Sequence, residues 1–105
     1  MKRNRKKPEM SDITRRYRLL LDDFRARARA CGIRTRVVRR GERLFLQIIN
    51  GDYRAKINIA PDDAPFPSMS EVTDLLIAWR DILLEEPPEE LRRLYPAYMR
   101  AARPL

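Results

Sequence analysis

The change of hydrophobic period at Gly32 constrains the fold of this chain most strongly. Before Gly32, apolar residues recur at spacings of three and four, which is typical of an amphipathic helix that starts near Ser11 or Asp12. Gly32 is suited to end that helix, because glycine readily adopts the left-handed conformation found there. The apolar stripe consists of Ile13, Tyr17, Leu20, Leu21, Phe24, Ala28 and Cys31.

After Gly32 the apolar residues alternate with polar ones, which is the period of half-buried strands. Turns at Arg40-Gly41-Glu42 and Asn50-Gly51 divide this segment into three strands. We expect an antiparallel meander of three strands whose apolar face packs on the preceding helix. The residues expected under the helix are Val37, Leu44, Leu46, Ile48, Ile57 and Ile59.

Helical signals return after the proline-containing loop over Ala60 to Met69. Ser68 and Glu71 have the spacing of a capping box and predict a helix from about Ser70 to Glu86. A shorter helix is expected from Glu89. The predicted class is therefore α+β, with a small antiparallel sheet of three to four strands packed against an N-terminal helix and C-terminal helices.

The chain has 105 residues, enough for one domain with a small core. Residues 1–10 carry five basic residues and little apolar surface, so we expect a basic, flexible arm there. Residues 11–105 are expected to form the single domain.

Positive charge is concentrated in the N-terminal part of the chain. Residues 1–60 hold 18 basic and 6 acidic residues, a net charge of +12, whereas residues 61–105 hold 5 and 9, a net charge of −4. Such a field attracts a polyanion to the N-terminal part, because bound phosphates release condensed counterions. Arginine dominates, and its planar guanidinium both pairs with phosphate and stacks on bases. A GC-rich genome or adaptation to heat also raises arginine content, but neither explains the segregation.

The strand face opposite the helix is the predicted binding site, because basic residues follow a nucleic-acid backbone while aromatic rings stack on bases. Phe45 is the ring expected among the cations, and its alternative role is packing under a loop or a partner chain. Tyr53 is added as a ring that projects from the sheet edge. The predicted binding residues are Arg34, Arg36, Arg43, Phe45, Gln47, Tyr53, Arg54 and Lys56, with Ile49 and Asn58 on the same face as most of them.

Three other features of the sequence are explained without a ligand. Phe66 and Trp79 flank the proline-containing loop, and large aromatic residues are more often core. Cys31 fits a buried structural thiol better than a reactive one. Arginines opposite the apolar stripe fit a solvated helix face; they are Arg15, Arg18, Arg25 and Arg29.

Residue types that catalyse reactions or bind metals are scarce. The chain has no histidine, no glycine-rich phosphate loop and one cysteine, so we expect no metal, no cofactor and no enzymatic activity. The acidic pairs Asp62-Asp63, Glu85-Glu86 and Glu89-Glu90 are explained by helix capping and solvation. A single cysteine and the lack of a long apolar run predict a cytoplasmic protein that does not enter a membrane.

The layout of a long helix, the strands RTRVVRRGERLFLQIINGDYRAKINIA and a C-terminal helical segment resembles the ThermoDBP-like single-stranded-DNA-binding proteins of archaea. The resemblance covers about residues 11 to 86 and rests on layout and charge, with no invariant motif. It implies a thermophilic, archaeal DNA-binding protein with a fold other than the OB-fold, and assembly through the C-terminal part. That family has four strands, whereas three are clear here, and no leucine zipper follows.

The segment 70–105 holds more apolar surface than one helix and one sheet edge cover, so we expect it to assemble the protein into a homo-oligomer, a dimer or a tetramer. The expected interface residues are Ile77, Leu84, Leu91 and Tyr98.

The sequence therefore predicts a protein that binds single-stranded DNA with little sequence preference. RNA binding, including binding to ribosomal RNA, is one alternative. A second is a protein-interaction module that receives an acidic partner, and a third, less favoured one is a small nuclease.

Overall fold

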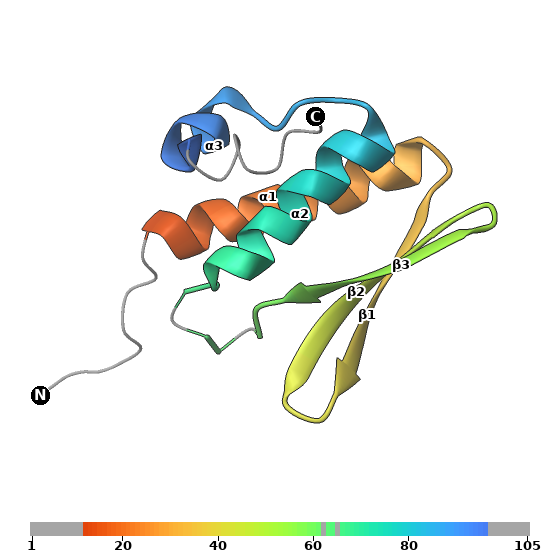
Figure 1. Cartoon of the computed structure of the whole chain (residues 1–105), viewed down its shortest axis with the longest axis horizontal. Coiled ribbons are helices and arrows are strands. Elements are labelled where there is room, and N and C mark those ends of the chain that lie inside the picture. Colours follow the sequence, from red (N-terminus) through yellow and green to blue (C-terminus); the bar gives the residue numbers. More distant parts are fainter. Residues whose placement is uncertain (1–11, 62, 65, 97–105) are drawn as a thin grey trace, which may run out of the picture.

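The computed structural model describes residues 12–61, 63–64 and 66–96. In chain order the elements are α1 (Asp12–Ala30), β1 (Arg34–Arg40), β2 (Arg43–Asn50), β3 (Tyr53–Ile59), α2 (Met69–Leu83) and α3 (Glu89–Leu94). The helices lie on one side of a twisted three-stranded sheet (Figure 1). The predicted α+β class is confirmed: an antiparallel sheet packs against an N-terminal helix and C-terminal helices. The proposed arm, residues 1–10, lies outside the described residues.

Helix α1 ends in the way that Gly32 predicts. The amide of Gly32 donates to the carbonyl of Arg29 (3.0 Å), and that of Ile33 donates to the carbonyl of Ala28 (2.8 Å). Gly32 itself has φ 82°, so the last turn closes as a Schellman motif. Cys31 stands at this turn with its side chain exposed, and the prediction of a buried thiol is wrong. The apolar stripe ends one turn earlier, at Ala28.

The sheet has the order β1-β2-β3 with antiparallel neighbours, as the strand signals predict. Arg40 pairs with Arg43, and Asn50 pairs with Tyr53, so each hairpin has a two-residue turn. Gly41 and Gly51 occupy the first turn position, each with φ 63°. Positive φ at the first position alone is the requirement of a type II′ turn, which suits the twist of the strands.

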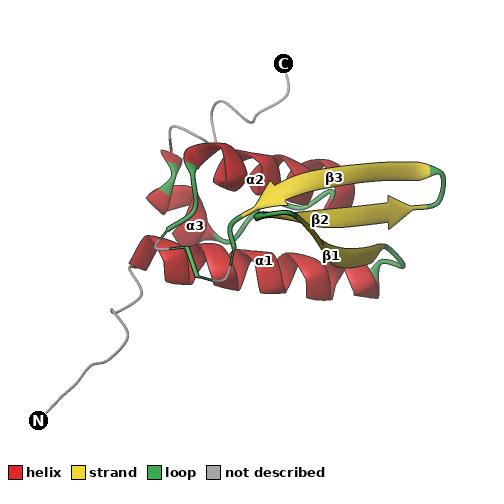
Figure 2. Ribbon diagram, turned by 90° about the horizontal axis from the view of Figure 1, so that it is seen from below, coloured by secondary structure: helices red, strands yellow, loops and turns green. Residues whose placement is uncertain are grey.

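Helix α1 packs along β1, and α2 packs along β3, so that together they cover one face of the sheet (Figure 2). The expected inner face is confirmed, with five of its six residues buried; Val37 lies on this face opposite Leu46 but is 41% exposed. Val37 lies on an edge strand, where the space beside α1 is an open groove that its side chain lines. The confirmed positions are Leu44, Leu46, Ile48, Ile57 and Ile59.

Helix α2 begins with the predicted capping box. The amide of Glu71 donates to Ser68 Oγ (3.2 Å), and the amide of Ser68 donates to the Glu71 carboxylate (2.9 Å). The helix ends at Leu83, three residues before the predicted end, because Leu84 adopts the left-handed conformation with φ 57°. The amide of Leu84 still donates to the carbonyl of Arg80 (3.0 Å).

The C-terminal segment contributes to the core. Leu91 and Tyr95 are buried, and Tyr95 donates its hydroxyl to the carbonyl of Ile13 on α1 (3.3 Å). The prediction that Leu91 is free for an interface is therefore wrong, because α3 packs on α1. Trp79 is also core, with its ring centroid 6.1 Å from that of Phe24.

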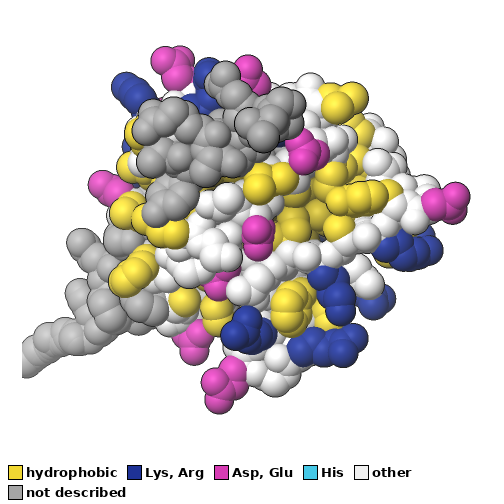
Figure 3. All heavy atoms as spheres, in the orientation of Figure 1, with side chains coloured by type: hydrophobic (Ala, Val, Ile, Leu, Met, Phe, Trp, Pro, Cys, Tyr) yellow, Lys and Arg dark blue, Asp and Glu magenta, His cyan; other side chains and the backbone are white. Residues whose placement is uncertain are grey.

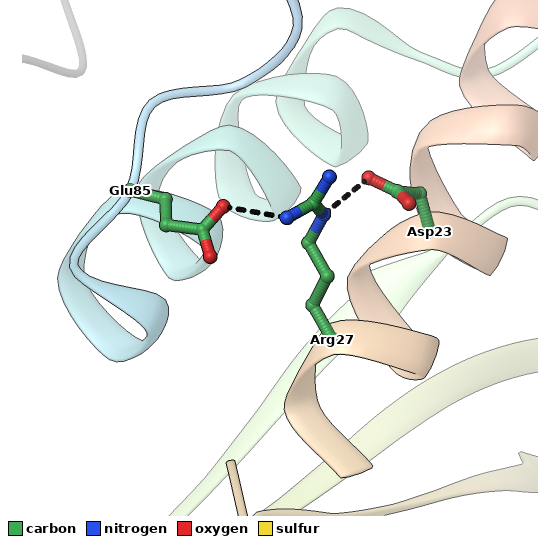
Figure 4. A network of polar contacts seen from close by, with 3 residues as sticks. All are labelled: Asp23, Arg27 and Glu85. Atoms are coloured by element: carbon green, nitrogen blue, oxygen red, sulfur yellow. Dashed lines mark hydrogen bonds and ion pairs between the residues drawn. The ribbon is translucent and has the colours of Figure 1, made fainter. Parts of the chain in front are cut away.

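Arg27 joins α1 to the chain segment that follows α2 (Figure 4). Its guanidinium pairs with Asp23 and with Glu85, each at 3.0 Å, and lies 5.8 Å from the Trp79 ring centroid. The hydrogen bond to Asp23 and the two carboxylate charges raise the pKa of Arg27. This arginine therefore covers one end of the core with a charge-paired, cation–π contact.

No helix in the described ranges is long and apolar enough to span a membrane.

Candidate nucleic-acid interface

The open face of the sheet displays its side chains in cross-strand rows. The rows follow from the register: Arg34, Ile49 and Arg54 form one row, and Arg36, Gln47 and Lys56 the next. Val38, Phe45 and Asn58 form a third, and Arg40 faces Arg43 at the end. We call these eleven residues the open face. Seven of the eight predicted binding residues belong to it: Arg34, Arg36, Arg43, Phe45, Gln47, Arg54 and Lys56.

The open face carries positive charge without acidic compensation. None of its eleven residues is Asp or Glu, and within the described ranges none of its cations forms an ion pair. Arg40 and Arg43 are direct cross-strand neighbours, an arrangement that destabilises a hairpin when both residues carry the same charge. Lysine and arginine side chains gather on the sheet side of the molecule in Figure 3. A bound polyanion would remove this repulsion.

Phe45 is half-buried in the middle of the open face, and the Lys56 ammonium lies 5.8 Å from its ring centroid. The helices pack against the opposite face (Figure 2), so no described helix covers the ring. A base-stacking platform needs an aromatic ring that is accessible from the sheet surface and a cation near that ring. Phe45 and Lys56 supply these two components. Burial under a partner chain is the alternative use of the same ring.

On β3 the last residue of the open face is Asn58, where an acidic residue approaches it. The Asn58 amide donates to the Glu71 carboxylate (3.3 Å) at the start of α2. The Glu71 carboxylate disfavours a phosphate beside Asn58, while the basic residues of the open face lie in the Arg34 and Arg36 rows and at the Arg40–Arg43 pair.

Tyr53 lies on the face of the sheet opposite the other predicted binding residues, and of these only Lys56 lines the same groove. It pairs with Asn50 on the helix-facing side and is 52% exposed. It lines a groove between β3 and α2 that also contains Asp74 and Asp81. Burial, and to a lesser extent the charge of Glu71, raise the pKa of Asp74. Two carboxyl groups make this side of β3 unfavourable for a polyanion.

The two remaining aromatic candidates, Trp79 and Phe66, differ in burial. Trp79 is core, as expected of a large ring, whereas Phe66 is 62% exposed.

Two helix arginines that the sequence assigned to a solvated face instead make contacts within the fold, Arg18 with the chain segment after β3 and Arg25 with β1. Arg18 donates to the carbonyl of Pro61 (2.7 Å), and Arg25 Nε donates to Thr35 Oγ1 (3.1 Å). Arg29 is exposed, and Arg15 pairs with Asp12 at 3.6 Å. The spacing of seven and four between Arg18, Arg25 and Arg29 was the available signal, because it places them on one flank of a helix.

No cluster of three or more potential metal-ligating His, Cys, Asp or Glu side chains occurs in the part of the chain that the structure describes. Comparison of the chain with family models, curated proteins and solved structures gave no match.

Proposed function

We propose that this protein binds single-stranded DNA across the open face, with little sequence preference. The observation that carries the proposal is the row arrangement, which surrounds the half-buried Phe45 ring with cations and with no strand carboxylate. In this proposal the arginines and Lys56 contact phosphates, while bases stack on Phe45. Every base has a π-face and every nucleotide has a phosphate, so these contacts discriminate little between sequences.

The proposal includes a binding role without catalysis or cofactor, and a cytoplasmic location. The exposed, unpaired thiol of Cys31 supports a reducing compartment. The resemblance to the ThermoDBP-like proteins stays part of the proposal and supplies no site residue.

RNA is the first alternative ligand, because the open face offers no group that would recognise or reject a 2′-hydroxyl by geometry alone. An acidic protein is the second alternative, because unpaired arginines also receive carboxylates. Fluorescence titrations with oligo-dT, oligo-U and duplex DNA distinguish these ligands. Preference for oligo-dT supports the proposal, preference for oligo-U supports RNA, and no binding at low salt supports the acidic protein.

The double variant Arg36→Ala/Lys56→Ala tests the site. Both residues lie in the same row and are exposed on the face opposite the core, so the fold should persist. Loss of two phosphate contacts should weaken oligo-dT binding and reduce the slope of log K against log salt by about 1.4 units.

The matched control is Arg92→Ala/Arg93→Ala on α3, which removes the same charge far from the sheet (Figure 1). Circular dichroism checks that both variants are folded. Equal slopes for the site variant, the control and the original protein would remove the open face from the binding site.

A further inference from the structure

A groove runs between α1 and the edge strand β1, on the side of the sheet opposite the open face. It consists of two hollows of about 590 and 480 Å³ that share Asp22 and Arg25 in their walls. Because they share wall residues, the two hollows lie next to each other along α1. We call the two together the edge groove. Its positively charged wall residues are Arg18, Arg25, Arg29, Arg34 and Arg39.

The edge groove is suited to phosphates and unsuited to bases. Five arginines face a single acidic residue, Asp22, and no Phe, Tyr or Trp lines either hollow. Base recognition without sequence preference depends on stacking, which needs a ring. Backbone recognition needs cations and a close approach. Gly32 permits such an approach, because the space next to its α-carbon is empty to 4 Å.

Several of these arginines keep donors available for a ligand. Arg29, Arg34 and Arg39 are exposed, and within the described ranges their side chains form no hydrogen bond or ion pair. Arg25 uses Nε for Thr35, which is one of the five N–H donors of a guanidinium. The Thr35 contact also orients the Arg25 guanidinium, so its remaining donors are pre-positioned beside β1.

The edge groove and the open face meet at Arg34. By register Arg34 belongs to the first row of the open face, and its side chain also lines the groove. Strand β1 is an edge strand, so no other strand separates the two surfaces. Arginines flank this edge on both sides, with Arg36 and Arg40 on the open face and Arg39 in the groove.

We infer that the edge groove holds the sugar-phosphate backbone of the same single strand whose bases lie on the open face. This inference rests on the proposed function. The strand crosses the β1 edge at Arg34 and continues along α1 past Arg29 and Arg25. The bases of the continuing segment point to solvent, because the groove has no ring for them.

Three ligands test the inference in fluorescence titrations at low and high salt. The first is an oligo-dT of about 6 nucleotides, the second one of about 20, and the third the short oligo-dT extended by an abasic deoxyribose-phosphate tail to the length of about 20. The inference predicts that the abasic tail raises affinity nearly as much as the thymidine tail does.

The groove variant is Arg29→Ala/Arg39→Ala, which removes two exposed arginines and leaves the Arg25–Thr35 contact in place. It should bind the short oligonucleotide like the original protein. For both long ligands it should lose most of the gain from the tail and about 1.4 units of salt slope. Arg92→Ala/Arg93→Ala is the matched charge control.

Two results would overturn the inference. One is a groove variant that matches the control on every ligand, and the other is an abasic tail that adds no affinity. Failure of the proposed function looks different: Arg36→Ala/Lys56→Ala would then leave the affinity for the short oligonucleotide unchanged, or no oligonucleotide would bind the original protein.

Discussion

At the scale of single residues, Phe45 distinguishes base stacking from simple charge attraction. Replacing Phe45 with Ala should reduce the affinity for oligo-dT by about 1–3 kcal/mol at every salt concentration, because stacking releases no counterions. The residue is half-buried and lies on the face opposite the core, so the fold should persist. Fluorescence titration over a salt series measures both affinity and slope.

Phe45→Trp is the matched control, because it keeps a ring at the same position and should retain most of the affinity. If the loss in Phe45→Ala disappears at high salt, the ring acts through the neighbouring Lys56 ammonium rather than by stacking.

The side-chain directions on the strands could largely be predicted from the sequence, because a period of two assigns each residue to a face. Phe45 and Arg36 were placed correctly on the face opposite the core. The exposure of Val37 and Cys31 could not be predicted in this way. Periodicity gives the direction of a side chain, whereas exposure at an edge strand or a helix end depends on how far the neighbouring element extends.

At the scale of elements, α3 shows that the number of apolar residues in a segment does not tell whether they lie in the core or at an interface. The seven residues between Pro88 and Pro96 read as a surplus segment, yet Leu91 and Tyr95 fill the space beside the N-terminal half of α1. The helices and strands themselves carry strong local signals, such as the capping box at Ser68 and the turn glycines. The packing of α3 depends on a long-range contact with Ile13, which leaves no local pattern.

Leu91→Ala tests whether α3 belongs to the core. Leu91 is 5% exposed, so its truncation should leave a cavity and reduce the free energy of unfolding by about 2–5 kcal/mol. Chemical denaturation followed by circular dichroism measures the change. The exposed neighbour Arg93→Ala should change stability little. A midpoint for Leu91→Ala equal to that of the control would mean that α3 is detached in solution.

Assembly through the C-terminal segment could be tested with a chain that ends at Glu86. Such a chain would also lose the core residue Leu91 and expose the α1 surface that α3 covers, so it is a poor test. Substitutions in the full-length chain are needed instead.

At the scale of the whole molecule, the basic groove and the acidic groove lie at opposite edges of the sheet. The open face and the edge groove surround β1, whereas Asp74 and Asp81 lie beside β3. The net charges of the two parts of the sequence predicted that such a separation exists. They did not predict the edge groove, because it combines residues of α1 and β1 that only the fold brings together. The arrangement orients a polyanion toward the β1 side before any specific contact forms.

The predicted homo-oligomer retains one strongly exposed candidate. Of the four residues expected at the interface, Leu91 is core, Ile77 is half-buried, and Tyr98 lies outside the described residues. Leu84 is 86% exposed and adopts the left-handed conformation, which is unfavourable for a branched residue. A large apolar side chain held in that conformation at the surface costs stability in a monomer and is suited to the pocket of a second copy.

Leu84→Gly distinguishes the effect of Leu84 on monomer stability from its effect on assembly. Glycine accepts φ 57° without strain, so the variant monomer should be more stable by about 0.5 kcal/mol after the greater flexibility of its unfolded chain is counted. If Leu84 anchors a dimer or tetramer, light scattering should show the original protein as an oligomer at micromolar concentration and Leu84→Gly as a smaller species. Leu84→Met keeps the apolar contact and should keep the larger mass.

An original protein that remains monomeric would contradict assembly. Equal masses for an oligomeric original protein and for Leu84→Gly would place the interface elsewhere. Joining basic faces from several copies would raise affinity for a long strand through effective concentration, so loss of assembly should weaken binding of long oligonucleotides more than short ones.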